Sequence, residues 1–519
     1  MDRTDATGTP IKPGKSSQKT SLSSAILEAA LDRSGTSTKT GLRNLPAELL
    51  QEISRRVASG SAGDTAAGLH ALMLSNRFLN ASVLNGKSVK EHYLFLQPLI
   101  GAFKALKPDL AIHEINSQML ALMGPKQRQE QVTAVLGLAY EEDKARAISG
   151  LGPGLAHLSE SQREELVTAA LGLTSSWKKA EAVAGLGAGL AHLSESQRED
   201  LVTAALGLTD ELLKAKALAG LGAGLAYLSE SQREELVTAA LRLAYEGDKA
   251  EAIEGLGAGL AHLSESQRED LVTAIFDLAP GLAPQWPMAQ AIAGLGAGLA
   301  HLSESQREEL VTTALGLSNE GDMAYAIARL GAGLAHLSES QREDLVTATL
   351  GLVDEGPKGQ AIAGVGAGLA HLSESQREDL VTAALGLTHE RHKTRAIAGL
   401  GAGLTALERS QRQALVKATL GLTNGEHKAH AIAGLGAGLA ALEGSQQEAL
   451  VTAALGLTIK GDKAKAIAGL GAGLVALDGT QQQALVKAAL GLADRWHKAR
   501  AIVGLVNGYQ ASRVRDYLR

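Results

Sequence analysis

The stretch that decides the fold is residues 158–192, which read LSESQREELVTAALGLTSSWKKAEAVAGLGAGLAH. Close variants of this stretch follow one another to the end of the chain, at a period of 35 residues with a single step of 39. One glutamine marks the same position of each copy: Gln127, Gln162, Gln197, Gln232, Gln267, Gln306, Gln341, Gln376, Gln411, Gln446 and Gln481. A fixed period of this size is typical of a solenoid, in which each unit buries its apolar face against its neighbours.

Each copy is predicted to form a helical hairpin. Ser159 and Gln162 occupy the N-cap and N3 positions of a first helix, which is the pattern of a capping box. A second helix is expected from about Lys179 to Leu193, because apolar residues recur there on one face. We therefore expect an all-α fold, a superhelical α-solenoid that resembles HEAT and TPR arrays. It would cover residues 125–505 in about 11 units, with a C-terminal cap at residues 506–519.

Three glycines recur near the end of the second helix in almost every copy, as Gly185, Gly187 and Gly189 do in the second copy. A glycine inside a helix costs about 1 kcal/mol relative to alanine, so this pattern needs an explanation. One interpretation is close packing between the helices of adjacent repeats. The other is a springy array.

Composition narrows the classes of function. The chain has no cysteine, which excludes disulfides and thiolate metal sites, and it has no apolar run of membrane-spanning length. Residues 1–130 carry 16 Lys and Arg against 11 Asp and Glu, whereas residues 131–519 carry 34 against 45. Nucleic-acid binding needs clustered positive charge, so an acidic array with few aromatic residues argues against a nucleic-acid ligand.

The copies differ mainly between the two helices and at one position of the second helix. That position carries Arg146, Glu181, Lys216, Glu251, Tyr325, Gln360, Arg395, His430, Lys465 and Arg500. A fixed framework with one varying ridge is how repeat proteins build a binding surface. The alternative is neutral drift in exposed loops. The candidate target-binding residues on this ridge are Trp177, Leu212, Leu213, Tyr245, Trp286, Tyr325, Arg391, His427, Lys460 and Trp496. Trp286 belongs to the 39-residue step, whose prolines predict a loop that is either a contact site or a tolerated insertion.

The sequence shows no constellation typical of catalysis, a cofactor or a metal. A histidine recurs at His157, His192, His262, His301, His336 and His371. An active site is a single constellation, so a residue repeated in successive copies is expected to serve the stacking of repeats. His389, His392, His427, His430 and His497 lie on the variable ridge without the spacing of a known metal motif, which favours a solvated surface.

The region before the array differs in composition. Residues 1–40 are rich in Ser and Thr and poor in large apolar residues, so we expect them to be disordered. Residues 41–83 are expected to form a small helical module, and residues 84–124 a helical connector or cap. The module begins LPAELLQEI at Leu45, where proline stands at a tolerated position of a first helical turn.

Residues 42–80 resemble an F-box through Leu45, Pro46, Leu49, Leu50, Ile53, Leu72 and Leu74. The resemblance implies that these residues dock onto the Skp1 adaptor of cullin ubiquitin ligases, while the repeats hold the substrate. This chain departs from the family pattern in having a longer loop between helices and no following tryptophan.

The layout of a Ser/Thr-rich start, an F-box-like module and near-identical repeats is similar to that of type III secreted effectors of plant-associated bacteria. That resemblance implies secretion into a host cell, to its cytoplasm or nucleus, and a host protein as the target. The repeat opening LSESQ also resembles that of transcription-activator-like effector repeats, which read DNA. The phosphate-contacting glycine, lysine and glutamine of that family are missing here.

Three hypotheses follow. The leading one is a non-enzymatic effector that acts as an F-box-like substrate adaptor, with the solenoid binding a host protein. The second is a scaffold in which residues 41–124 merely cap the solenoid. A DNA-binding repeat protein is the most distant.

Overall fold

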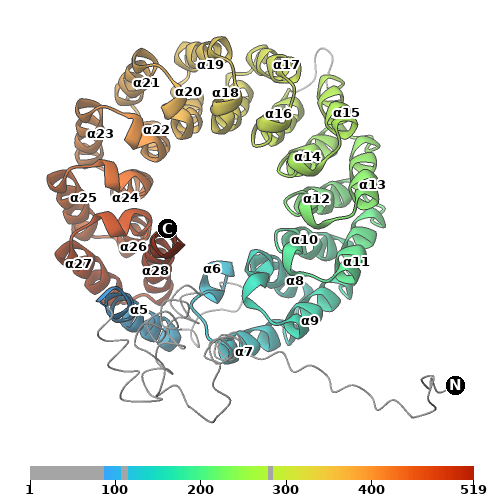
Figure 1. Ribbon diagram of the computed structural model, residues 1–519, viewed down its shortest axis with the longest axis horizontal. Helices are drawn as coiled ribbons and strands as arrows, with labels where there is room; N and C mark the ends of the chain where they lie inside the picture. The colour runs from blue at the N-terminus through green and yellow to red at the C-terminus, as the bar shows by residue number, and fades with distance from the viewer. Residues whose placement is uncertain (1–86, 107–114, 279–284, 519) are drawn as a thin grey trace, which may run out of the picture. The chain divides into compact units, whose positions relative to one another are not determined.

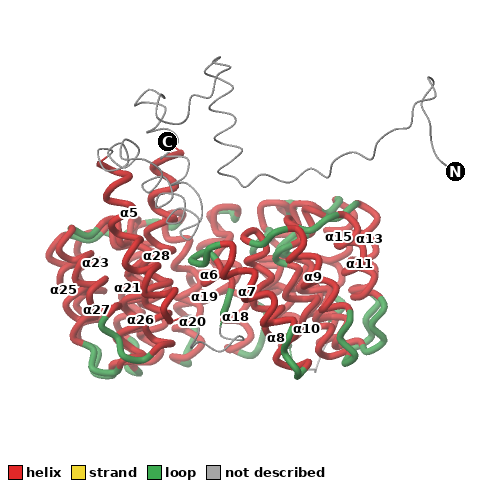
Figure 2. Tube along the Cα trace, turned by 90° about the horizontal axis from the view of Figure 1, so that it is seen from below, coloured by secondary structure: helices red, strands yellow, loops and turns green. Residues whose placement is uncertain are grey.

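The protein is an all-helical α-solenoid. The computed structural model describes residues 87–106, 115–278 and 285–518, and their regular elements are helices joined by loops and turns (Figure 2). From Leu96 onward, these residues belong to one compact unit. The expected disordered segment (residues 1–40) and the F-box-like module (residues 41–83) lie outside the described residues.

Eleven helical hairpins follow α5 (Lys87–Leu106) and α6 (Ser117–Leu120) in the described part of the chain. Their first helices, called A helices here, are α7 (Pro125–Leu136), α9 (Glu160–Leu171), α11 (Glu195–Leu206), α13 (Glu230–Leu241), α15 (Glu265–Phe276), α17 (Glu304–Leu315), α19 (Glu339–Gly351), α21 (Glu374–Gly386), α23 (Arg409–Gly421), α25 (Gly444–Gly456) and α27 (Gly479–Leu490). Their second helices, called B helices, are α8 (Glu141–Leu151), α10 (Ser176–Gly187), α12 (Glu211–Gly222), α14 (Glu246–Gly257), α16 (Trp286–Gly296), α18 (Glu320–Leu330), α20 (Glu355–Val365), α22 (Glu390–Leu400), α24 (Gly425–Leu435), α26 (Lys460–Leu470) and α28 (Arg495–Leu518).

Short 3₁₀ turns lead from the B helices to the next A helices. They are η4 (Gly152–His157), η5 (Leu190–His192), η6 (Leu225–Tyr227), η7 (Leu260–His262), η8 (Leu299–His301), η9 (Gly331–His336), η10 (Gly366–His371), η11 (Gly401–Ala406), η12 (Gly436–Ala441) and η13 (Gly471–Ala476). The predicted second helix of residues 179–193 is therefore wrong at its C-terminal end. Helix α10 ends at Gly187, and Gly189 has non-helical torsions (φ −106°, ψ 6°).

The predicted capping box is confirmed at the start of the A helices. In α9, the Ser159 hydroxyl accepts a hydrogen bond from the backbone N–H of Gln162 (3.3 Å), and the Gln162 side chain accepts one from the backbone N–H of Ser159 (2.9 Å). The same reciprocal arrangement persists where Asp478 replaces the serine. Where Glu408 and Glu443 replace it, the glutamine side chain still accepts a hydrogen bond from the N-cap backbone N–H. The box satisfies two backbone donors that a helix N-terminus otherwise leaves unpaired.

Most A helices carry an arginine whose side chain donates hydrogen bonds to the carbonyls of the preceding 3₁₀ turn. The Arg198 guanidinium donates from Nη1 to the carbonyls of Leu193 (2.7 Å) and Leu190 (3.5 Å). In later copies, Gln447 and Gln482 donate from Nε2 to the equivalent carbonyls. The residue type can change because the geometry asks only for a long side chain with an N–H donor.

The glycines explain why the array curves. A β-carbon on Gly220 of α12 would lie 2.5 Å from the Cβ atom of Ala184 in α10, and one on Gly222 would overlap the backbone of Gly255 in α14. Successive B helices thus touch backbone to backbone, while leucine and valine side chains fill the interior between the A and B helices. The B helices consequently lie on the concave side and the A helices on the convex side of the array (Figure 1). This supports close packing over the springy-array interpretation.

A second contact joins each of several repeats to the next. The Glu390 carboxylate, at the start of α22, accepts hydrogen bonds from the backbone N–H groups of Thr423 (2.7 Å) and Asn424 (3.0 Å) in the turn before α24. Equivalent contacts are made by Glu141, Glu211, Glu320 and Glu355. These glutamates lie in the variable inter-helix segment, yet their role is structural. In the described part of the chain, no helix combines the length and apolar character needed to cross a membrane.

Candidate protein-binding surface

The concave side of the array presents one variable residue per repeat. This column consists of Arg146, Glu181, Lys216, Glu251, Gln290, Tyr325, Gln360, Arg395, His430, Lys465 and Arg500. Each is flanked along its B helix by two buried residues, which are alanines except for Gly359 and Thr394. Its own side chain therefore projects away from the core. None of these side chains is buried. The column is therefore a row of accessible groups on a fixed backbone, which is the arrangement expected of a recognition surface.

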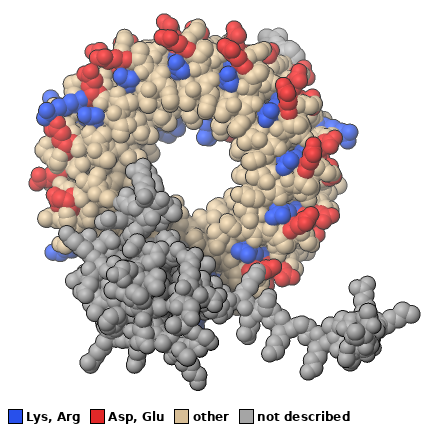
Figure 3. Space-filling model, viewed as in Figure 1, with Lys and Arg blue, Asp and Glu red and all other residues tan. Residues whose placement is uncertain are grey.

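Charge is distributed differently on the two sides of the array. Acidic side chains gather along the convex rim over the A helices, with Lys and Arg side chains inside them (Figure 3). The B helices, by contrast, change in sign along the chain. Helix α14 carries Glu246, Asp248, Glu251 and Glu254 against a single lysine, whereas α22 and α26 each carry an excess of two positive charges.

An aromatic and acidic cluster spans α14, α16 and α18. Glu254 accepts hydrogen bonds from the side-chain amide of Gln290 (2.8 Å) and from the hydroxyl of Tyr325 (2.8 Å), two repeats away. The Trp286 and Tyr325 rings lie with their centroids 4.8 Å apart, and the Arg329 guanidinium carbon lies 5.5 Å from the Tyr325 centroid. Burial raises the pKa of Glu251, and burial together with the Glu254 carboxylate raises the pKa of Tyr325.

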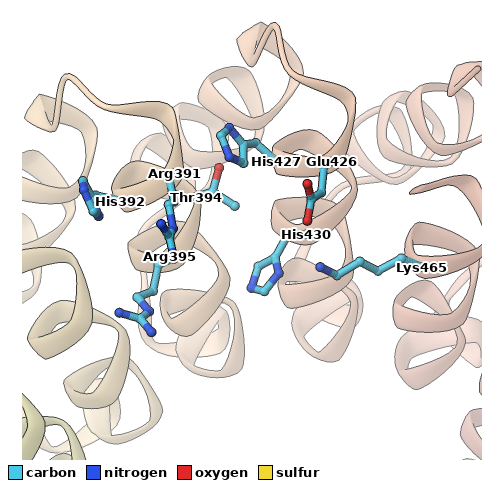
Figure 4. A pocket seen from close by; sticks show the side chains of 8 residues that line it. All are labelled: Arg391, His392, Thr394, Arg395, Glu426, His427, His430 and Lys465. Atoms are coloured by element: carbon cyan, nitrogen blue, oxygen red, sulfur yellow. The ribbon is translucent and has the colours of Figure 1, made fainter. Parts of the chain in front are cut away.

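A basic pocket lies on α22, α24 and α26. Its volume is about 610 Å³, and its lining residues are Arg391, His392, Thr394, Arg395, Glu426, His427, His430 and Lys465 (Figure 4). Burial, with Lys465 and Arg395 close by, lowers the pKa of His430. The His427 Nδ1 atom lies 3.5 Å from the Glu390 carboxylate, so that protonation of this ring would complete an ion pair between them.

Most of the predicted ridge residues are accessible. Trp177 is 46% exposed, and the Lys216 ammonium lies 5.1 Å from its ring centroid. Leu212, Tyr245, Trp286, Arg391, Lys460 and Trp496 are exposed, and Tyr325 and His427 are half-buried. Trp496 lines a separate cavity of about 380 Å³ with residues of α6, α26 and α28.

Two sequence-based expectations are wrong. Leu213 is only 6% exposed and belongs to the core, because it follows the N-cap Asp210 on the inward face of α12. The recurring histidines do not stack between repeats: His192, His262, His301, His336 and His371 are exposed at the ends of the 3₁₀ turns. The adaptor residues Leu45, Pro46, Leu49, Leu50, Ile53, Leu72 and Leu74 lie outside the described residues.

The structure also gives a place to residues that were not among the candidate target-binding residues, although three of them belong to the variable ridge. Arg395, His430 and Lys465 meet in the basic pocket, and Glu254 joins three repeats. Glu254 could have been found from the sequence, because the equivalent position holds alanine in most other copies. Among the described residues, no group of three or more His, Asp or Glu side chains is arranged to hold a metal ion.

No family model and no curated protein matches this chain. Similar solved structures include those of karyopherins. Importin beta crystallised in an ammonium sulfate condition is 12% identical with a TM-score of 0.38, over 94% of this chain and 66% of that chain. The karyopherin Kap121p bound to the SUMO protease Ulp1p is 12% identical with a TM-score of 0.40, over 93% of this chain and 57% of that chain. This chain thus spans about three fifths of the length of the karyopherins it matches.

Proposed function

We propose that the array is a protein-interaction solenoid whose concave column binds a polypeptide partner. The observation that supports this most directly is the contrast between framework and column. The residues that build the hairpin and pack successive B helices recur in copy after copy, while the accessible concave position changes in size and charge at almost every step. Exposed aromatic residues on the same side, such as Trp177 and Trp286, are the residue types that anchor protein interfaces.

A site-specific photo-crosslinker tests this proposal. The full chain carries benzoylphenylalanine either at Tyr325 on the concave side or at Glu199 on the exposed face of α11, and is irradiated in a plant-cell extract. We expect discrete protein adducts from the concave position that the convex position does not give. Equal adducts from both positions, or none from Tyr325, would contradict a concave binding surface.

The second part of the proposal concerns residues 42–80, and it rests on the F-box-like sequence alone. We propose that Leu45, Pro46, Leu49, Leu50 and Ile53 dock onto a Skp1 adaptor, so that a host protein held by the array is delivered to a ubiquitin ligase. The full chain should bind purified Skp1, and Leu45→Ala with Pro46→Ala should abolish that binding. Retained binding in the double variant would refute the F-box assignment and leave the scaffold hypothesis.

Export is a third part, and its support is the layout of the chain. We propose that residues 1–40 direct type III secretion from a bacterium into a host cell. A reporter fused to these residues should leave the cell only when the secretion apparatus is functional. Export without that apparatus would contradict the proposal.

A further inference from the structure

The basic pocket on α22, α24 and α26 departs from the rest of the concave surface in its charge. It brings together Arg391, Arg395 and Lys465 with the single carboxylate Glu426, and adds three histidines that gain charge on protonation (Figure 4). In a repeat region with more acidic than basic residues overall, this is a local concentration of positive charge inside a concavity. Positive groups in a concave site focus the electrostatic field and attract anions.

Thr394 provides a second and independent observation. Its side chain lines the pocket, is only 3% exposed, and has an Oγ1 atom without a hydrogen-bond partner. The equivalent position is alanine in every other described repeat except one, where it is Gly359. A buried hydroxyl without a hydrogen-bond partner costs free energy. Its presence in this repeat alone indicates that a ligand supplies the missing partner.

We propose that this pocket binds an anionic side chain, a phosphorylated residue or a carboxylate, in an acidic segment of the partner polypeptide. This inference rests on the proposed protein-binding function and names the chemistry of the ligand. Arg391 and Arg395 would contact the oxyanion from α22 on one side of the pocket, and Lys465 from α26, two repeats further along, on the other. The Thr394 hydroxyl would donate a hydrogen bond to the same oxyanion.

The remainder of the concave side disfavours a nucleic acid as the occupant. A polyanion that followed the column would meet Glu251 and Glu254 on α14, four repeats from Arg395, where carboxylates outnumber cations. The carboxylates of α14 would repel an extended polyanion that reached them. A short acidic segment held in the pocket would not feel them, because salt screens charges that are more than about 10 Å apart. A local acidic segment of a polypeptide therefore fits both the pocket and its surroundings.

The test uses the full chain and fluorescein-labelled peptides of equal length in an anisotropy titration. One peptide is neutral, one carries a run of glutamates and one carries a single phosphoserine, and a thymidine oligonucleotide is measured beside them. We expect at least one anionic peptide to bind about tenfold or more tightly than the neutral one, and to weaken in high salt. Comparing the glutamate and phosphoserine arms identifies the source of the oxyanion.

Matched variants tie the binding to the pocket. Arg391→Gln with Arg395→Gln should lower the affinity for the anionic peptide about tenfold. Arg146→Gln, in the same column but outside the pocket, should change that affinity by no more than about twofold. Thr394→Ala should weaken binding several-fold without loss of stability, because it restores the residue of the other repeats. Binding that is equal for neutral and anionic peptides, an equal loss in Arg146→Gln, or an oligonucleotide that binds as tightly with the same arginine dependence would overturn the inference.

The two proposals fail separately. Peptides that do not discriminate, together with concave adducts at Tyr325, refute the anion pocket and leave the protein-binding function. If the anionic peptides bind more tightly than the neutral one but Tyr325 gives no adducts, the anion pocket stands and the proposed concave protein-binding surface is refuted. A further readout is the titration of His430 by NMR. Its neighbours are Lys465, Arg395, His427 and Glu426, and a bound anion should raise its lowered pKa.

Discussion

A β-carbon placed on Gly220 would lie 2.5 Å from the Cβ atom of Ala184 in the preceding repeat, inside the distance that two carbon atoms tolerate. This one relationship, repeated along the array, sets the spacing of the B helices. It also makes the glycines of this sequence requirements of packing.

Gly220→Ala should therefore destabilise the array. Overpacking against a neighbouring backbone costs about 1–3 kcal/mol, because backbone atoms cannot rotate away as a side chain can. Gly421→Ala is the matched control: it also lies at a helix end, and nothing lies within 4 Å of the position that its β-carbon would take. Urea unfolding should show a lower midpoint for Gly220→Ala and an unchanged or higher one for Gly421→Ala. Equal midpoints would contradict the packing account.

Acid should weaken the inter-repeat contacts of Glu355 and Glu390. Hydrogen bonds from the backbone N–H groups of the next repeat hold the pKa of each carboxyl at about 2, well below its ordinary value of 4.5. A lowered folded-state pKa contributes stability that is complete above the unfolded value and is lost as the pH falls from about 4.5 towards 2. The thermal midpoint should fall across that window, and Glu355→Gln with Glu390→Gln should flatten the fall.

The control for this pH dependence is Glu343→Gln, on the exposed face of α19. It should leave the slope of midpoint against pH close to that of the parent chain. If the double variant keeps the parent slope as well, other carboxylates carry the acid sensitivity.

Arg198 should tolerate glutamine better than alanine. Its guanidinium holds two carbonyls of the preceding 3₁₀ turn, and Gln447 and Gln482 make the same contacts in their own repeats. Arg198→Ala should lower the free energy of unfolding by about 1 kcal/mol, and Arg198→Gln by clearly less. Urea titrations of both variants decide this, and equal losses would show that charge, not donor geometry, matters.

Tyr325 and Glu254 should be energetically coupled across two repeats. Their side chains share a hydrogen bond of 2.8 Å. In a double-mutant cycle with Tyr325→Phe and Glu254→Ala, we expect a coupling free energy of about 1 kcal/mol. Trp286 lies against Tyr325, and its fluorescence would report the same contact in a chain where phenylalanine replaces Trp177 and Trp496. A coupling near zero would mean that this hydrogen bond contributes nothing to the stability of the array.

The sequence by itself determined the repeat, the α-solenoid and the capping boxes. All three depend on local spacing: a Ser and a Gln three residues apart specify a helix start whatever surrounds them. The variable column could also be found, because equivalent positions of a repeat necessarily align on one ridge.

Only the tertiary structure decided which side of the array is concave, because that depends on how closely two glycine-bearing helices approach across repeats. It also decided that Leu213 is core and that Glu390 joins two repeats. Arg395, His430 and Lys465 follow one another at intervals of 35 residues, and they share one pocket only because the stacking of B helices brings equivalent positions of successive repeats side by side.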